Sequence, residues 1–124
     1  MAGMASTRPN SVVHLELHTR DLPGAIAFYA QLLGWRPERI HAGNGSYVAL
    51  GVGDRVGGGV VESGAEHPLW VPYVTVPDIG TATHGAERLG GKILIGPREG
   101  SHGYRSVVSA PDAGEVAFWQ PKGR

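Results

Sequence analysis

The chain has 124 residues, 41% of them hydrophobic and 18% charged, which is typical of a single globular domain with a hydrophobic core. Eleven basic residues balance eleven acidic ones, so no overall charge favours binding to nucleic acid or to a membrane surface, and the absence of cysteine excludes disulfides and thiolate chemistry. No apolar run approaches the roughly 20 residues of a membrane span, and we therefore expect a cytoplasmic protein.

The first predicted strand, Val13–Thr19, has two chemically different faces. Because side chains alternate across a strand, His14, Glu16 and His18 share one face while valine and leucine side chains share the other. The apolar face is expected to enter the core. The polar face is either an ordinary solvated surface or the wall of a functional site, depending on what the rest of the chain builds over it.

A helix is predicted between Asp21 and Gly34. Asp21 is a typical N-cap, Pro23 fits the first turn, and Gly34 is placed to end the helix. Apolar residues recur between them at helical spacing, and we interpret their aromatic members as core rather than as a cofactor site. The predicted apolar stripe consists of Leu22, Ala25, Ile26, Phe28, Tyr29, Leu32 and Leu33.

Three short strands are expected next. The segment Trp35–Ile40 contains Pro37, which favours an edge strand, and Ser46–Val52 and Val56–Glu62 follow it. The last of these contains the triple glycine Gly57-Gly58-Gly59, which lacks the spacing of a phosphate-binding loop. We expect a bend there, or the close approach of another backbone or of a ligand.

The pattern then repeats. The segment Val71–Ile79 matches His14–Leu22 at a constant offset, and the same offset carries Gly34 to Gly91. This internal duplication predicts a second set of the same elements. They are a helix over Asp78–Leu89, with Ile79, Ala82, Ala86 and Leu89 on one side, and strands at Lys92–Ile95, Tyr104–Ser109 and Glu115–Trp119.

Each repeat therefore has the order strand, helix, strand, strand, strand. We place the first module at residues 12–63 and the second at residues 69–121 of one domain spanning 12–124. Residues 1–11 are small and polar and are expected to form a flexible N-terminal tail.

This arrangement resembles the vicinal oxygen chelate superfamily, which includes glyoxalase I, extradiol dioxygenases and bleomycin-resistance proteins. The resemblance implies an α+β fold in which two tandem βαβββ modules curl a mixed sheet into a cup, with the helices outside, and it suggests a homodimer. The segments that carry it are His14–Leu22, Phe28-Tyr29, Leu32–Trp35, Tyr73–Asp78, Leu89–Gly91 and Ala110–Pro121.

The resemblance also implies positions for a divalent metal ion, one on the first and one on the last strand of each module. In the first module these positions match His14 and Glu62, whose side chains suit a metal site without sulfur. In the second module they fall on Val71 and on either Ala117 or Trp119, none of which binds metal. The superfamily's full ligand set is therefore absent.

A reduced metal site is one interpretation of what remains. Glu16 lies about 6.6 Å along the strand from His14 and could join His14 and Glu62, whereas His18 is about 13 Å away and cannot share one ion with His14. Glu115 is a more remote substitute. The alternative is a hydrogen-bonded pair of His14 and Glu62 in a water-filled cup without any metal.

Other side chains are expected to line the cup and bind ligand. By strand parity, Tyr73, Thr75 and Trp119 face the same way as the predicted metal positions of the second module, and they join Glu16 and His18 of the first. This mixture of aromatic, hydroxyl and ionisable groups suits a small, partly aromatic or polyfunctional molecule.

Three functions are compatible with this pattern. The first is a protein that binds a small molecule, in the manner of sequestration or resistance proteins. The second is a lyase, isomerase or dioxygenase that uses a divalent metal, and the third is a metal-free acid–base enzyme using His14 with Glu62 or Glu16. The loop Pro97–Gly103 is either a lid over the site or an ordinary mobile connection.

Overall fold

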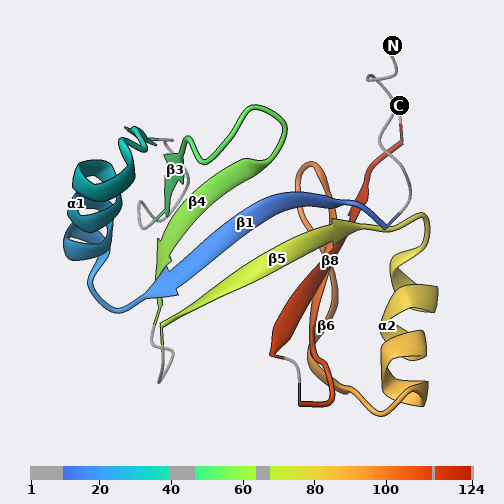
Figure 1. Cartoon of the computed structure of the whole chain (residues 1–124). Coiled ribbons are helices and arrows are strands. Elements are labelled where there is room, and N and C mark those ends of the chain that lie inside the picture. The colour runs from blue at the N-terminus through green and yellow to red at the C-terminus, as the bar shows by residue number, and fades with distance from the viewer. Residues whose placement is uncertain (1–9, 40–46, 64–67, 113, 124) are drawn as a thin grey trace. The chain divides into compact units, whose positions relative to one another are not determined.

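The computed structural model describes residues 10–39, 47–63, 68–112 and 114–123. It contains eight strands and two helices in the order βαβββ, βαβββ, which confirms the predicted α+β class and the duplication (Figure 1). The elements are β1 (Val12–Thr19), α1 (Leu22–Leu33), β2 (Pro37–Arg39), β3 (Tyr47–Leu50), β4 (Gly57–Glu62), β5 (Leu69–Thr75), α2 (Ile79–Arg88), β6 (Lys92–Glu99), β7 (Gly103–Ser109) and β8 (Glu115–Pro121).

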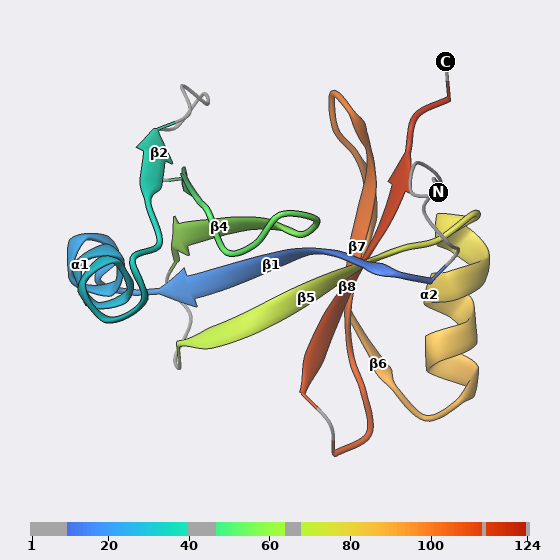
Figure 2. The same cartoon turned by 45° about the horizontal axis from the view of Figure 1, so that its top comes forward.

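The chain forms two compact units. Of the described residues, those from Val13 to Val71 form the N-terminal unit, and those from Pro72 onward form the C-terminal unit together with residues 10–12. Each contains a mixed sheet in which the first strand of the repeat runs parallel to the last and the remaining neighbours are antiparallel. The strand orders are β2-β3-β4-β1 and β5-β8-β7-β6 (Figure 2).

The two helices begin as the sequence predicts. The carboxylate of Asp21 accepts a hydrogen bond from the Gly24 backbone N–H at 3.0 Å, and the Asp78 carboxylate accepts one from the Thr81 N–H at 2.8 Å. Gly34 ends α1 with φ of 73°, a left-handed conformation that favours glycine. An aspartate N-cap thus begins the helix of each repeat, which agrees with the internal duplication.

The core of the N-terminal unit lies between α1 and its sheet. Leu17, Leu50 and Val60 are buried there, and the inner residues of α1 pack against them with Trp70, whose indole N–H donates to the Tyr29 hydroxyl at 3.2 Å. The predicted apolar stripe on α1 is wider than the face of the helix that packs against the core, whose residues are partly buried. Phe28, Leu32 and Leu33 are 56%, 62% and 51% exposed.

The helix of the C-terminal unit packs only partly as predicted: Ile79 of the predicted side is buried, but Leu89 is not. Ile79 and Thr83 are its buried residues, and the Thr83 hydroxyl lies 2.8 Å from that of Ser106 on β7. Leu89, placed in the core by its spacing, is 78% exposed because the helix ends at Arg88 and Leu89 belongs to its cap.

The segment between β6 and β7 is a tight hairpin rather than a long loop. β6 continues to Glu99, so Pro97, Arg98 and Glu99 of the predicted loop Pro97–Gly103 are strand residues. The Glu99 carboxylate pairs with Lys122 Nζ at 2.6 Å. A mobile lid from Pro97 to Gly103 is therefore not formed.

The boundary of the predicted tail also shifts. The Asn10 N–H donates to the Thr75 carbonyl at 2.8 Å, and the Thr75 N–H donates to the Ser11 carbonyl at 2.9 Å, so residues 10 and 11 belong to the folded C-terminal unit. Residues 1–9 lie outside the described part of the chain. Neither of the helices in the described residues is long and apolar enough to cross a membrane.

Candidate functional site

In the N-terminal unit, α1 covers one face of the sheet and the other face is free of helix. Strand register fixes which side chains occupy this helix-free face, because laterally paired residues point the same way. His14 pairs with Gly57, Glu16 with Gly59 and His18 with Val61. Tyr47 and Ala49 of β3 and Glu38 of β2 extend the same face. The polar face of the opening strand is thus opposite the core, as its alternation predicts.

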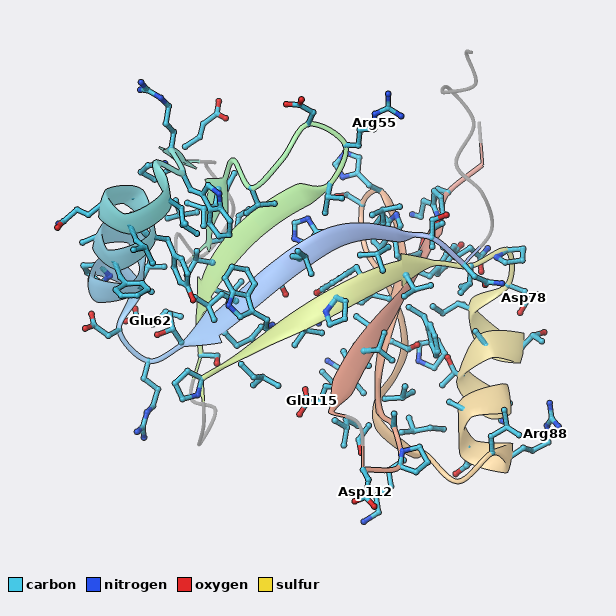
Figure 3. The ribbon with its side chains drawn as sticks, in the orientation of Figure 1. Arg55, Glu62, Asp78, Arg88, Asp112 and Glu115 are labelled. Atoms are coloured by element: carbon cyan, nitrogen blue, oxygen red, sulfur yellow. The ribbon has the colours of Figure 1, made fainter. Side chains whose placement is uncertain are left out.

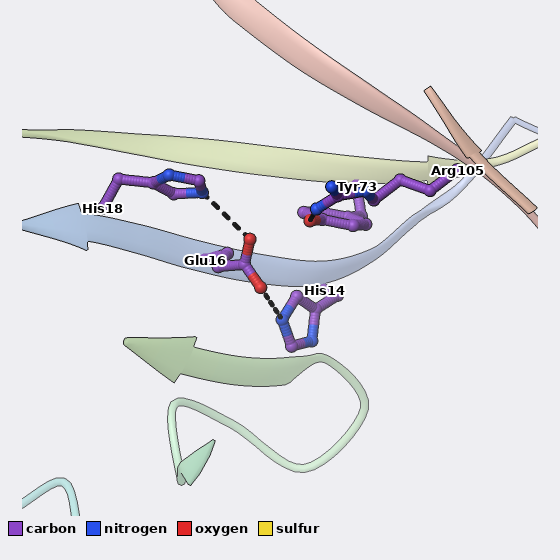
Figure 4. Close-up of polar contacts among 5 residues, drawn as sticks. All are labelled: His14, Glu16, His18, Tyr73 and Arg105. Carbon is purple, nitrogen blue, oxygen red and sulfur yellow. Dashed lines mark hydrogen bonds and ion pairs between the residues drawn. The ribbon is translucent and has the colours of Figure 1, made fainter. Parts of the chain in front are cut away.

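A carboxylate lies between two imidazoles on this face. Glu16 Oε1 is 2.9 Å from His18 Nε2, and Glu16 Oε2 is 3.7 Å from His14 Nε2 (Figure 4). The Glu16 side chain is 10% exposed, and those of His14 and His18 are 23% and 26% exposed. Burying a carboxylate is costly unless partners satisfy it, and the two imidazoles provide them. Glu16 therefore holds both rings in place.

Tyr47 lies beside this cluster, above a glycine. A Cβ built on Gly59 would fall 2.5 Å from the Tyr47 ring and hydroxyl, so a larger residue at this position would displace the phenol from where it lies. Partial burial, and secondarily the negative charge of Glu16, raise the pKa of Tyr47 above its ordinary value of 10.0. Tyr47 is consequently a neutral hydrogen-bond donor at physiological pH.

The other two glycines of the triplet are also closely approached. A Cβ on Gly57 would lie 2.9 Å from His14 Nδ1, and one on Gly58 would lie 2.6 Å from the Leu50 carbonyl oxygen. The expectation that a backbone comes close to the triple glycine is confirmed at Gly58. On the helix-free face, Gly57 and Gly59 form a floor on which His14 and Tyr47 lie.

A cleft of about 490 Å³ opens on this floor. His14, Tyr47 and Ala49 line it from the sheet, and Glu38 lines it from the edge strand. The connection between β3 and β4 contributes Gly51, Gly53, Asp54, Arg55 and Val56, and the two strands add Leu50, Gly57 and Gly58. This volume lies within the range of 300 to 1,000 Å³, typical of small-molecule sites.

The helix-free face of the C-terminal unit carries the remaining predicted ligand-binding residues. Tyr73 pairs with Ala117 and Thr75 with Trp119, so these side chains share one face, as predicted from parity. Arg105 pairs with Trp119 from β7, and its Nη1 donates to the Tyr73 hydroxyl at 3.2 Å (Figure 4). The opposite face of this sheet packs on α2 through Ser106.

A family model of the glyoxalase, bleomycin resistance protein and dioxygenase superfamily matches residues 11–118. The chain belongs to this superfamily. No curated protein matches the sequence. The predicted resemblance is thus confirmed over most of the chain.

Solved structures of the superfamily's fold are similar to this chain at low sequence identity. Methylmalonyl-CoA epimerase from Mycobacterium tuberculosis is 15% identical with a TM-score of 0.65, and the match covers 95% of this chain and 93% of that one. A hypothetical protein from Bacillus halodurans is 12% identical with a TM-score of 0.66, over 94% and 98% of the two chains. The Mn(II)-bound glyoxalase from Novosphingobium aromaticivorans is 15% identical with a TM-score of 0.63, over 93% of this chain and 40% of that one. These likenesses support the fold.

Glu62, predicted as a catalytic residue and metal ligand with His14, lies elsewhere. It pairs with Thr19 and shares the helix-covered face with Val60, while His14 pairs with Gly57 five residues away, or about 16 Å along the strands. Its Oε2 faces the Leu22 N–H at 3.5 Å at the start of α1 (Figure 3). The predicted pair of His14 and Glu62 is not formed, because a one-residue difference in register reverses the face of a strand residue.

The residues present do not fit the metal site of metal-dependent superfamily members. On the helix-free face of the N-terminal unit, β4 offers Gly57, Gly59 and Val61, none of which is a metal ligand. His14, Glu16 and His18 remain, but the two imidazoles contact opposite oxygens of the Glu16 carboxylate and do not converge on one point, whereas three protein ligands are usual even for catalytic zinc. Within the described residues, no group of three His, Asp or Glu side chains is placed to hold an ion. The reduced site of His14, Glu16 and Glu62 is therefore not assembled.

Two prominent residues of these faces escaped sequence analysis. Tyr47 lies in a short strand whose alternation is too brief to assign faces, and its position is shown by its pairing with Val61 and its closeness to Gly59. The sequence does not distinguish Arg105 from an ordinary surface arginine of an amphipathic strand, and only the structure shows its hydrogen bond to Tyr73. The three glycines of β4 are the one sequence feature that could have indicated space for a large side chain such as Tyr47 from a neighbouring strand.

Proposed function

We propose that this protein binds a small organic molecule in the cleft of the N-terminal unit. The observation that carries the proposal is the cleft of about 490 Å³ on the glycine floor, with His14 and Tyr47 on its surface. A concave site with a few fixed polar groups is typical of small-molecule recognition. Sequestration of such a molecule, as in resistance proteins, is the function that this geometry supports best.

The polar groups of the cleft favour a ligand with hydrogen-bonding oxygen or nitrogen atoms. The Tyr47 hydroxyl is a donor, and the His14 imidazole is a donor or an acceptor according to its tautomer. Asp54, Glu38 and Arg55 add both signs of charge at the lining. A neutral or zwitterionic molecule therefore matches the cleft better than a strongly charged one.

A second candidate is a metal-free proton-transfer enzyme, and the contact between His14 and Glu16 favours it. A buried carboxylate next to an imidazole can fix the tautomer and the orientation of the ring. The distance of 3.7 Å between Glu16 Oε2 and His14 Nε2 permits this role once a ligand tightens the contact. Replacement of His14 or Glu16 should then abolish turnover and leave ligand affinity largely intact. The metal-dependent alternative has no comparable support, since its ligand set is incomplete.

The test is a fragment library screened by ligand-observed NMR against the full chain, with bleomycin and methylmalonyl-CoA added as probes suggested by the superfamily and the similar structures. Fragments that bind should lose affinity about tenfold in His14→Ala, because one hydrogen bond to a desolvated group is worth about 1.4 kcal/mol. His84→Ala, at an exposed position on α2, is the matched control and should not change affinity. Equal affinities in both variants would contradict the proposal.

A further inference from the structure

A row of side chains crosses the helix-free face of the C-terminal unit. Thr75 of β5 pairs with Trp119 of β8, Trp119 pairs with Arg105 of β7, and Arg105 pairs with Arg98 of β6. Because laterally paired strand residues point the same way, all four lie on one face. The row places Arg105 next to the indole of Trp119 and Arg98 on the strand beyond Arg105.

The two arginines are in an unfavourable arrangement by themselves. Residues directly opposite in an antiparallel pair have Cβ atoms about 4.5 to 5.5 Å apart, and like charges at such positions are destabilising. Arg105 is partly buried, and its hydrogen bond of 3.2 Å is to the neutral hydroxyl of Tyr73. An anion between the guanidinium groups would relieve their repulsion.

No carboxylate of the described residues forms an ion pair with Arg98 or Arg105. Glu99, the acidic neighbour of Arg98 in the sequence, is engaged by Lys122 at 2.6 Å. Glu115 shares the face but pairs with Ser109, four residues along β8 from Trp119. The positive charge of the row is therefore compensated by no acidic side chain in the described part of the chain.

Trp119 provides a flat surface beside these charges. A Cβ on Gly103 would lie 2.7 Å from the Trp119 ring, so the indole lies close over the glycine. Trp119 is partly exposed, and an indole next to a guanidinium group suits a ligand that joins an anionic group to a planar body.

We propose that Arg98, Arg105 and Trp119 form a binding site for an organic anion, a phosphate or carboxylate attached to a planar or aromatic body. The guanidinium groups bind the anionic group, Tyr73 holds Arg105 in position, and the planar body stacks on Trp119. This site is distinct in residues and chemistry from the cleft of the N-terminal unit, so it extends the proposed function without depending on it.

The test uses the isotope-labelled full chain and the indole N–H resonance of Trp119, assigned by its loss in Trp119→Phe. Phenyl phosphate, benzoate and neutral benzamide are titrated separately at constant ionic strength. Phenyl phosphate or benzoate should shift the resonance saturably and benzamide should not, and whichever anion binds identifies the group. Arg98→Gln and Arg105→Gln should each weaken binding about tenfold or more, the effect of losing one charge-assisted pair.

Arg88→Gln removes the same charge from an exposed position on α2 and should bind like the wild type (Figure 3). Arg105→Lys should restore part of the affinity lost in Arg105→Gln. If Arg105→Gln fails to fold, the exposed Arg98 position still decides the question. Equal response to benzamide, no response to either anion, or unchanged affinity in Arg98→Gln would overturn the proposal.

Discussion

The two repeats share one backbone plan and differ in the polar groups that they carry on it. In the N-terminal unit the helix-covered side is an apolar core, and the ionisable cluster around Glu16 lies on the helix-free face. In the C-terminal unit a hydroxyl pair, Thr83 and Ser106, is buried beneath the helix, and Arg105 with Tyr73 occupies the helix-free face. The polar groups that each repeat offers on this face therefore depend on its side chains, because the backbone arrangement is the same in both.

The last strand of each repeat shows this difference most clearly. Gly59 pairs with Glu16 in the first repeat, and Ala117 pairs with Tyr73 at the matching place in the second. The triple glycine of β4 therefore corresponds to Glu115, Val116 and Ala117 of β8. Removing side chains from β4 leaves room for the His14 and Tyr47 rings. A cleft forms where the strand has no side chains of its own.

Gly58→Ala should break the N-terminal unit most severely. Its new Cβ would lie 2.6 Å from the backbone oxygen of Leu50, which cannot move without opening the hairpin of β3 and β4. We expect the free energy of unfolding to fall by about 1 to 3 kcal/mol, the usual cost of overpacking, measured by urea denaturation. Gly53→Ala is the control, since nothing lies within 4 Å of its Cβ position. Equal stability of the two variants would show that β3 and β4 are not packed as described.

Ser106→Ala should have a smaller effect, confined to the C-terminal unit. The change removes one partner of Thr83, which keeps its hydrogen bond of 2.6 Å to the Ile79 carbonyl. We expect a loss of about 1 kcal/mol in the free energy of unfolding. Ser101→Ala, at an exposed turn, should cost less, and adding Thr83→Val should cost less than the sum of the single changes. Additive losses would indicate that the two hydroxyls do not interact.

Tyr47 should make stability depend on alkaline pH. Its pKa is raised in the folded state, so its stabilising contribution is complete below the unfolded value of about 10 and declines as pH rises from there through the folded value. Tyr47→Phe should therefore flatten the loss of stability in this window. Glu16→Gln should lower the pKa of Tyr47, followed by ultraviolet absorbance of tyrosinate. An unchanged pKa would mean that the charge of Glu16 does not act on Tyr47.

Asp78 should give the smallest effect, at acid pH. Hydrogen bonds from the Thr81 backbone and side chain lower the pKa of Asp78 below its ordinary value of 3.8. Its contribution is therefore present above that value and is lost as pH falls through the lower folded value. Asp78→Asn, which still caps α2, should lose less stability on acidification than the wild type in thermal melts, whereas Asp112→Asn should behave like the wild type (Figure 3). Identical acid profiles for all three proteins would contradict this account of the cap.

The fold was predictable because its determinants are local and repeated. Asp21 and Asp78 mark the helix starts, Gly34 marks an end, and the duplication orders the strands. The alternation of His14, Glu16 and His18 also assigned their common face correctly. Each of these features depends on neighbouring residues in the sequence.

The site was predictable only in part because it depends on register between distant strands. Assigning Glu62 to the side of His14 required the alignment of β1 with β4 to within one residue, which the sequence does not define. The same holds for Arg98 opposite Arg105, whose pairing follows irregularities in β6. The hydrogen bond between Glu16 and His18 was not predictable either. Residues two apart on a strand touch only when their side chains lean toward each other, and the sequence does not define side-chain orientation.

The most direct test of the proposed function is a crystal structure of the full chain soaked with the fragments that bind it. We predict fragment density in the cleft of the N-terminal unit, within hydrogen-bonding distance of His14 and Tyr47. Density for every fragment at other places, with the cleft holding only solvent, would contradict the proposal that this cleft binds the ligand.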